Sequence, residues 1–283
     1  MSWPLTPGHE IAGTVAELGD GVEEFAVGDR VAVGWFGGCC YHCDPCRKGV
    51  FIHCANGKVP SWHYPGGYAE SVTVPVSALA RIPAELSDVE AAPMSCAGVT
   101  TYHALRETNA LPGDRVAILG VGGLGHLGVQ FARAMGFETV AIARGTAKAE
   151  DARKLGAHHY VDSTSGDVAK ALQALGGVAV VLATANNATA MADTVGGLLP
   201  QGQLVTIGVT ADPLPISPAQ LISPGLSVIG HPSGTAKDVE ETMYFAVLSG
   251  VRAWTQELPL SQAADGYAAL EQGRAHYRTV LTV

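Results

Sequence analysis

A glycine-rich turn between a predicted strand and a predicted helix is the feature that most constrains the fold of this chain. The apolar run Arg115–Leu119 leads directly into Gly120-Val121-Gly122-Gly123-Leu124-Gly125, and a helical pattern follows to residue 136. In such a turn, one glycine makes the bend, a second lets the backbone approach a pyrophosphate, and a third lets helix and strand pack closely. The N–H groups that open the helix favour an anion. The turn therefore predicts a dinucleotide site, with a plain strand–helix turn as the alternative. Its residues are Gly120, Gly122, Gly123, Leu124 and Gly125.

The apolar runs around this turn have the alternation of strands and helices that is typical of a doubly wound α/β domain. Apolar strand candidates alternate with helical segments, and the run 178–182 has no polar alternation, as expected for a strand covered on both faces. The six strand candidates are Arg115–Leu119, Thr139–Ala143, His159–Val161, Val178–Ala183, Leu204–Ile207 and Leu226–Ile229. The helical segments between them lie near 123–136, 146–155, 165–175, 187–197 and 217–222. Further helices are predicted at 235–249 and 261–272, and a last strand at Arg278–Val283.

Residues 9–82 instead contain short β-type runs that Gly and Pro interrupt, which predicts an all-β lobe. The runs are Ile11–Leu18, Arg30–Trp35, Tyr68–Val74 and Ala78–Ile82. Ser87 is the predicted N-cap of a following helix, with Asp88 and Glu90 in its first turn.

Charge and hydropathy exclude several classes of function. The net charge is −9, from 17 Lys and Arg against 26 Asp and Glu, and no basic run offers a nucleic-acid or membrane-surface site. No apolar run approaches the ~20 residues of a membrane span, and the first residues lack the pattern of a secretory signal. A soluble, cytoplasmic protein with reduced thiols is therefore expected.

Five of the six cysteines lie between Cys39 and Cys54. Reduced, closely spaced thiols on a turn-rich segment suit a closed, tetrahedral structural zinc site. Cys39 does not fit the spacing of the other four cysteines in this run and is expected not to bind the metal. An iron–sulfur cluster and unrelated buried cysteines are the alternatives. The predicted ligands are Cys40, Cys43, Cys46 and Cys54.

The end of the second predicted strand bears on which dinucleotide would bind. An NAD(H) site usually has Asp or Glu there to hold the ribose 2′-hydroxyl. This chain has Arg144, and no acidic residue follows before Glu150. A guanidinium can pair with a 2′-phosphate, so NADP(H) is favoured over NAD(H), although Arg144 could also be an ordinary surface arginine.

Several motifs taken together resemble those of the zinc-dependent medium-chain alcohol dehydrogenases, in the branch with cinnamyl-alcohol-type dehydrogenases and bacterial aldehyde reductases. The resemblance covers essentially the whole chain. Its motifs are Gly8-His9-Glu10, the four-cysteine run, Gly66-Gly67-Tyr68-Ala69-Glu70, Cys96-Ala97-Gly98, Gly120–Gly125 and 274–281.

The resemblance implies an α/β chain with a GroES-like, β-rich catalytic domain at 1–97 and a zinc lobe at 37–56. A six-stranded Rossmann domain at 98–231 and a segment at 232–283 that returns to the catalytic domain would follow. His9 and Cys96 would bind a catalytic zinc, with Glu10 as their partner or an exchangeable ligand. Thr100 would touch the nicotinamide and Arg278 the cofactor pyrophosphate. The reaction would be reversible interconversion of small-molecule alcohols with aldehydes or ketones by hydride transfer. The assembly would be a homodimer or homotetramer, paired through the edge strand at 226–229.

One departure from the family pattern concerns the metal. The family has a further cysteine ligand and a proton relay well upstream of Gly-His-Glu, whereas this sequence begins eight residues before His9. A catalytic zinc needs three protein ligands, so we expect an N-terminally truncated chain with impaired activity. A non-catalytic remnant that binds NADPH and zinc is the alternative. A zinc-free quinone reductase is disfavoured by His9, Cys96 and the cysteine run.

Overall fold

The computed structural model describes residues 4–283, which form two compact units. The first unit contains the chain up to Val99 together with Ser233–Val283, and the second contains Thr100–Pro232. Among residues 4–283, no helix combines the length and the apolar character that a membrane span would need.

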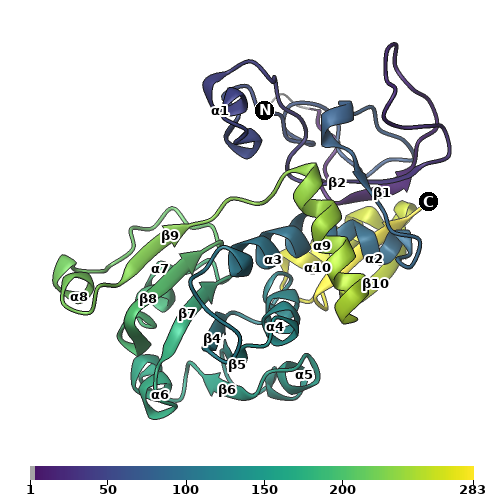
Figure 1. Cartoon of the computed structure of the whole chain (residues 1–283). Helices are drawn as coiled ribbons and strands as arrows, with labels where there is room; N and C mark the ends of the chain where they lie inside the picture. The colour runs from purple at the N-terminus through teal and green to yellow at the C-terminus, as the bar shows by residue number, and fades with distance from the viewer. Residues whose placement is uncertain (1–3) are drawn as a thin grey trace. The chain divides into compact units, whose positions relative to one another are not determined.

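The second unit contains a six-stranded parallel sheet in the order β6-β5-β4-β7-β8-β9 (Figure 1). This confirms the predicted α/β fold, and the order of strands reverses between β4 and β7, where doubly wound sheets bind ligands. The strands are β4 (Arg115–Leu119), β5 (Glu138–Ala143), β6 (His159–Asp162), β7 (Val178–Ala183), β8 (Leu198–Thr206) and β9 (Ser227–Gly230).

The centre of this sheet is buried on both faces, as its apolar sequence predicts. Val116, Ala117 and Ile118 of β4 and Val140 of β5 have no exposed surface, so successive side chains pack on opposite faces of the sheet. The helices of the unit are α4 (Gly125–Ala134), α5 (Ala149–Lys154), α6 (Val168–Ala174), α7 (Ala188–Ala192) and α8 (Pro218–Ile222), together with nearly all of α3 (Val99–Arg106) and the 3₁₀ turn η4 (Val195–Gly197).

β8 begins six residues before the predicted Leu204. Its first half contains Gln201 at a φ of 63°, and its register against β7 shifts between Val178 and Val180. The strand therefore contains an irregularity, which breaks the apolar pattern from which its start was predicted.

The first unit contains an antiparallel sheet of β1 (Ile11–Thr14), β2 (Arg30–Val33) and β3 (Ala80–Arg81). A second, parallel pair joins β10 (Thr255–Pro259) to β11 (Arg278–Thr282). The helices are α1 (Asp44–Arg47), α2 (Asp88–Pro93), α9 (Ala236–Ser249) and α10 (Ala263–Glu271). The shorter turns are η1 (Phe51–His53), η2 (Val76–Ala78), η3 (Met94–Gly98) and η5 (Leu260–Gln262).

The prediction of a strand at Tyr68–Val74 is wrong, because those residues form no strand. The segment that leads into it is instead held by single backbone bonds. Gly67 N–H donates to Gly8 C=O and Tyr68 N–H donates to Pro7 C=O, both at 2.9 Å. These bonds fix the segment beside His9 without forming a ladder.

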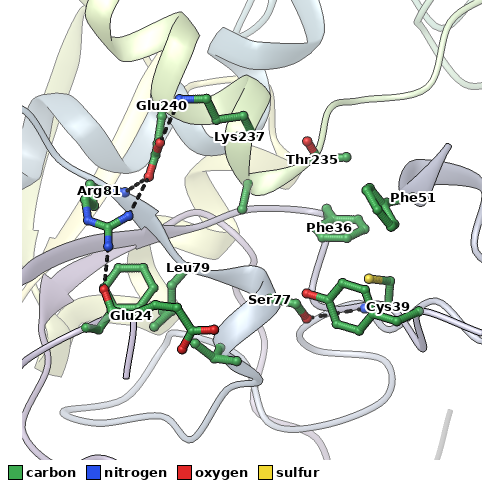
Figure 2. A pocket seen from close by; sticks show the side chains of 14 residues that line it. Glu24, Phe36, Cys39, Phe51, Ser77, Leu79, Arg81, Thr235, Lys237 and Glu240 are labelled. Atoms are coloured by element: carbon green, nitrogen blue, oxygen red, sulfur yellow. Dashed lines mark hydrogen bonds and ion pairs between the residues drawn. The ribbon is translucent and has the colours of Figure 1, made fainter. Parts of the chain in front are cut away.

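The segment after residue 232 packs against the N-terminal residues through α9. The backbone N–H of Arg81 donates to Glu240 Oε1 at 2.9 Å, and Lys237 Nζ pairs with the same carboxylate at 3.2 Å (Figure 2). Arg81 also stacks on Phe25, with its guanidinium carbon 4.3 Å from the ring centre. α9 begins with a capping box between Thr235 and Asp238, which satisfies its first N–H groups.

Candidate metal and dinucleotide sites

The structure brings Cys40, Cys43, Cys46 and Cys54 together, with their four sulfur atoms within 4.8 Å of one another. Cys43 is the N-cap of α1, and Cys46 lies one turn further on. The Sγ of Cys54 is 3.8 Å from that of Cys43 and 3.6 Å from that of Cys40. A tetrahedral zinc with Zn–S bonds of about 2.3 Å would separate its ligand sulfurs by roughly 3.8 Å. The thiol set and its spacing therefore fit zinc.

Backbone and amide N–H groups surround these sulfurs. Cys40 N–H and Asn56 N–H donate to Cys54 Sγ at 3.3 and 3.4 Å, and Asn56 Nδ2 donates to Cys40 Sγ at 3.3 Å. The bond from Asn56 is the main reason that the pKa of Cys40 falls to about 5. Donors of this kind favour thiolate, the form that binds metal.

Cys39 is outside this cluster. Its backbone N–H donates to Ser77 Oγ at 3.4 Å. Cys39 lines a shallow hollow of about 320 Å³ with Phe36, Arg81 and Glu240 (Figure 2). None of the residues predicted to act in catalysis lines this hollow.

His9 lies two residues before β1 and packs edge-on against Trp35, with ring centres 5.2 Å apart. Trp62 in turn packs against Trp35 at 5.1 Å. Burial, followed by the charge of Arg278, lowers the pKa of His9 below its ordinary value. The lowered pKa favours the neutral imidazole, which is the form that binds metal.

Cys96 lies in η3, a π-helical turn between α2 and α3. Such turns are rare and occur frequently at functional sites. Gly34 allows the end of β2 to approach this turn, because a Cβ on residue 34 would lie 1.9 Å from the carbonyl oxygen of Ser95. The glycine is therefore required by the close backbone contact beside Cys96.

Both carboxylate oxygens of Glu10 have partners. Oε1 accepts from the backbone N–H of Ala97 at 3.0 Å, and Oε2 accepts from Nη2 of Arg278. Burial lowers the pKa of Arg278 to about 10, which still leaves the guanidinium cationic at neutral pH. Glu10 could become a metal ligand only by losing one of these bonds. Within residues 4–283, His9, Glu10 and Cys96 do not form a three-ligand cluster.

The predicted pyrophosphate turn joins β4 to α4. Gly120 has a φ of 94°, and a Cβ at Gly125 would lie 1.7 Å from the carbonyl oxygen of Gly120. Gly122, by contrast, has nothing within 4 Å of its Cβ position. The outer two glycines are therefore required by the turn itself, whereas Gly122 leaves open space above the start of the helix. Gly123 and Leu124 complete the turn, and Leu124 is the N-cap of α4.

Arg144 follows β5, is exposed, and makes no ion pair with any residue of the described chain. The next residue is held firmly: Gly145 N–H donates to Asp162 Oδ1 at 2.7 Å, and Tyr160 Oη donates to Gly145 C=O at 2.6 Å. Asp162 also accepts from Thr164 N–H and Oγ1. Asp162 and Tyr160 were not predicted as site residues, since only the fold brings β6 beside Gly145.

The other two residues named from the family pattern lie in different units. Thr100 is in the first turn of α3 and is almost fully buried. Arg278 is in β11 and contacts Glu10. The contacts of Thr100 with a nicotinamide and of Arg278 with a pyrophosphate stay predictions.

Comparison with known proteins gives two family matches. Residues 123–247 match the family described as zinc-binding dehydrogenase, and residues 1–84 match the alcohol dehydrogenase GroES-like domain.

Individual relatives agree with these matches. An alcohol dehydrogenase of Penicillium expansum is 38% identical over 281 residues, which are 99% of this chain and 82% of the relative. The structure of a cinnamyl alcohol dehydrogenase of Sorghum bicolor superposes with a TM-score of 0.91 at 29% identity, covering 99% of this chain and 82% of the other. The structure of CAD from Helicobacter pylori, solved in complex with NADP(H), superposes with a TM-score of 0.86 at 27% identity, with the same coverage.

Proposed function

The chain belongs to the zinc-type medium-chain alcohol dehydrogenases, and we propose that it interconverts alcohols with aldehydes or ketones by using NADP(H) and zinc. The observation that carries this proposal is the glycine turn between β4 and α4, which leaves space at Gly122 at the start of a helix, the end whose dipole favours a phosphate. In this family such a turn positions a nicotinamide cofactor, the group that accepts or donates the hydride.

NADP(H) is the proposed cofactor rather than NAD(H). Arg144 is exposed and has no carboxylate partner, so its guanidinium is available for a 2′-phosphate. The carboxylate of Asp162 accepts hydrogen bonds from Gly145, the residue after Arg144, and from Thr164. Asp162 therefore supports the loop that presents Arg144. The NADP(H) complex of the Helicobacter pylori relative supports the same choice.

Two zinc sites are proposed. Cys40, Cys43, Cys46 and Cys54 would hold a structural ion, and His9 and Cys96 would bind a catalytic one. The imidazole and thiol of His9 and Cys96 are donors that zinc prefers. Bound there, zinc would polarise the oxygen of the substrate. Arg278 would hold Glu10 in place, and Glu10 would in turn fix the backbone beside Cys96 through Ala97 N–H.

Turnover by the 283-residue chain is expected to be low. His9 and Cys96 are two ligands where a catalytic zinc has three, and Glu10 is occupied by Arg278 and Ala97. This observation also favours the second candidate function, an NADPH- and zinc-binding protein without turnover.

One experiment separates the two candidates. The zinc-loaded chain is titrated with NADPH, and NADPH oxidation is then followed with a panel of aliphatic and aromatic aldehydes. Saturable binding with slow, aldehyde-dependent oxidation supports the oxidoreductase. Saturable binding with no oxidation above the rate without aldehyde supports the binding protein, and absence of NADPH binding contradicts both.

A homodimer or homotetramer is the proposed assembly. β9 is an edge strand, and all four of its residues are exposed, including Val228 at 39% and Ile229 at 37%. Pairing two β9 edges across a two-fold axis would satisfy their free N–H and C=O groups. Light scattering that shows a monomer at micromolar concentration would contradict this assembly.

A further inference from the structure

A group of three metal-binding side chains in the second unit is not used by the proposed reaction. It consists of His103 and Glu107, near the end of α3, and His231, which directly follows β9. One donor atom from each side chain lies within 4.8 Å of the other two. This is the same proximity that the four cysteines of the zinc lobe have.

The contacts within this group are short. Glu107 Oε2 is 2.9 Å from His231 Nε2, and Glu107 Oε1 is 3.6 Å from His103 Nδ1. The two imidazole rings have their centres 5.4 Å apart. One carboxylate therefore lies against both histidines, with a different oxygen toward each ring.

The local structure explains how these residues meet. His103 and Glu107 are four residues apart, so that they lie on one face at the end of α3. His231 is placed by β9, the edge strand of the sheet, and the backbone N–H of His231 donates to Thr206 C=O at 3.1 Å. The donors thus come from α3, from the residue that directly follows α3, and from the end of a strand.

The environment suits a metal ion. Only 7% of the His231 side chain and 19% of the His103 side chain are exposed, whereas Glu107 is 55% exposed. The Nδ1 of His231 is buried and has no hydrogen-bond partner in the described chain. Buried polar atoms are normally satisfied, so Nδ1 of His231 has unused bonding capacity, while Nε2 of the same ring faces the accessible carboxylate of Glu107.

We propose that His103, Glu107 and His231 form a third metal site, which binds a divalent transition ion such as Zn²⁺ with an open position toward solvent. Two imidazoles and one carboxylate are a known ligand set for zinc. Imidazole donors favour Zn²⁺, Cu²⁺ and Ni²⁺ over Mg²⁺ and Ca²⁺.

Such an ion would join the two places where the chain passes between its units. His103 is the fourth residue of the second unit, and His231 is the last but one. An ion bound to both would cross-link the entry and exit segments of this unit, and by binding the folded state it would raise the stability of the unit.

Zinc titration of the full chain tests the proposal. The parent for the titration carries Cys96→Ser, which removes the thiol of the proposed catalytic zinc site, and already holds the zinc of the cysteine lobe. Calorimetric titration with Zn²⁺ should show one further equivalent per chain. We expect about tenfold or more weaker binding in each of three variants, Glu107→Gln, His103→Asn and His231→Asn. Loss of a group that only supports a metal ligand already weakens binding by about tenfold, and each of these variants removes a proposed ligand. His158→Asn, a change in an exposed histidine of the same unit, should bind as the parent does.

Glu107→Gln is the decisive variant, since its side chain is mostly exposed and the change preserves its shape. Zn²⁺ should raise the thermal unfolding midpoint of the parent and leave that of Glu107→Gln unchanged. The proposal is overturned if the parent takes up no zinc beyond the cysteine lobe, or if Glu107→Gln binds the further equivalent as tightly as the parent does.

Discussion

Arg278 donates to the carboxylate of Glu10 across 268 residues of sequence, and so joins β11 to the segment beside His9. Only 23% of the Arg278 side chain and 17% of the Glu10 side chain are exposed. Each charge therefore depends on the other, because a partly buried ion without its partner is costly.

Removing one member of this pair should destabilise the protein. Arg278→Met leaves Glu10 without its cation, and we expect the free energy of unfolding to fall by about 2–4 kcal/mol, measured by urea unfolding. In the double variant Arg278→Met/Glu10→Gln no unpaired charge remains, and part of the loss should be recovered. Equal stability of the wild type and Arg278→Met would show that the contact is not formed in solution.

The Arg278–Glu10 pair illustrates what the sequence could not reveal. The strands of the second unit, Ser87 as N-cap and the glycine turn were predictable, because each depends on a local pattern. β10 was missed, because its sequence Thr-Gln-Glu-Leu-Pro has no strong strand pattern and becomes a strand only by pairing with β11.

The candidate site residues likewise divide into those that a local sequence pattern groups and those that only the fold brings together. The four cysteines could be grouped because they are close in sequence, and the structure brings them together. The group of His103, Glu107 and His231 could not be recognised from the sequence, since 124 residues separate Glu107 from His231. The pairing of Arg278 with Glu10 likewise depends on how the chain after residue 232 returns to the first unit.

The cysteine lobe should contain one zinc per chain. Cys43→Ser removes a thiolate, and we expect loss of that ion with a lower thermal midpoint, because the metal and the fold of the lobe are linked. Cys39→Ser is the matched control and should keep its zinc, as Cys39 lies outside the cluster. Metal analysis that finds iron, or thiol titration that finds disulfides, would refute the assignment.

Arg144→Ala should erase most of the preference for NADPH over NADH. A charge-assisted contact with the 2′-phosphate of ~1.5–3 kcal/mol corresponds to roughly ten- to a hundred-fold in affinity. The measurement is fluorescence titration of both dinucleotides. Arg153→Ala, which removes another exposed arginine in the same unit, should keep the preference. If the wild type binds NADH as well as NADPH, the role of Arg144 is wrong.

Glu138 should contribute stability that is lost in acid. Its carboxylate lies 2.6 Å from His159 Nε2 and 2.7 Å from Arg115 Nη2. The hydrogen bond with His159, followed by that with Arg115, lowers the pKa of Glu138. A lowered pKa in the folded state gives stability above the ordinary pKa of a carboxyl, and this stability disappears as pH falls through the lowered value.

Glu138→Gln should therefore be less stable than the wild type at pH 7, by at most about 1 kcal/mol since the pair is partly exposed. The gap should close as pH falls below about 4. Urea midpoints at pH 7 and pH 3 check this, with Glu150→Gln as an exposed control. A gap that is the same at both pH values would mean that the charge of Glu138 contributes nothing.

The most direct test of the proposed oxidoreductase is hydride transfer that depends on Cys96. The zinc-loaded wild type and Cys96→Ser are mixed with NADPH and an aromatic aldehyde, and the loss of NADPH absorbance and the formation of alcohol are measured together. The proposed site predicts slow, stoichiometric conversion by the wild type and none above background by Cys96→Ser. Equal conversion by both proteins, or none by a wild type that binds NADPH and zinc, would contradict it.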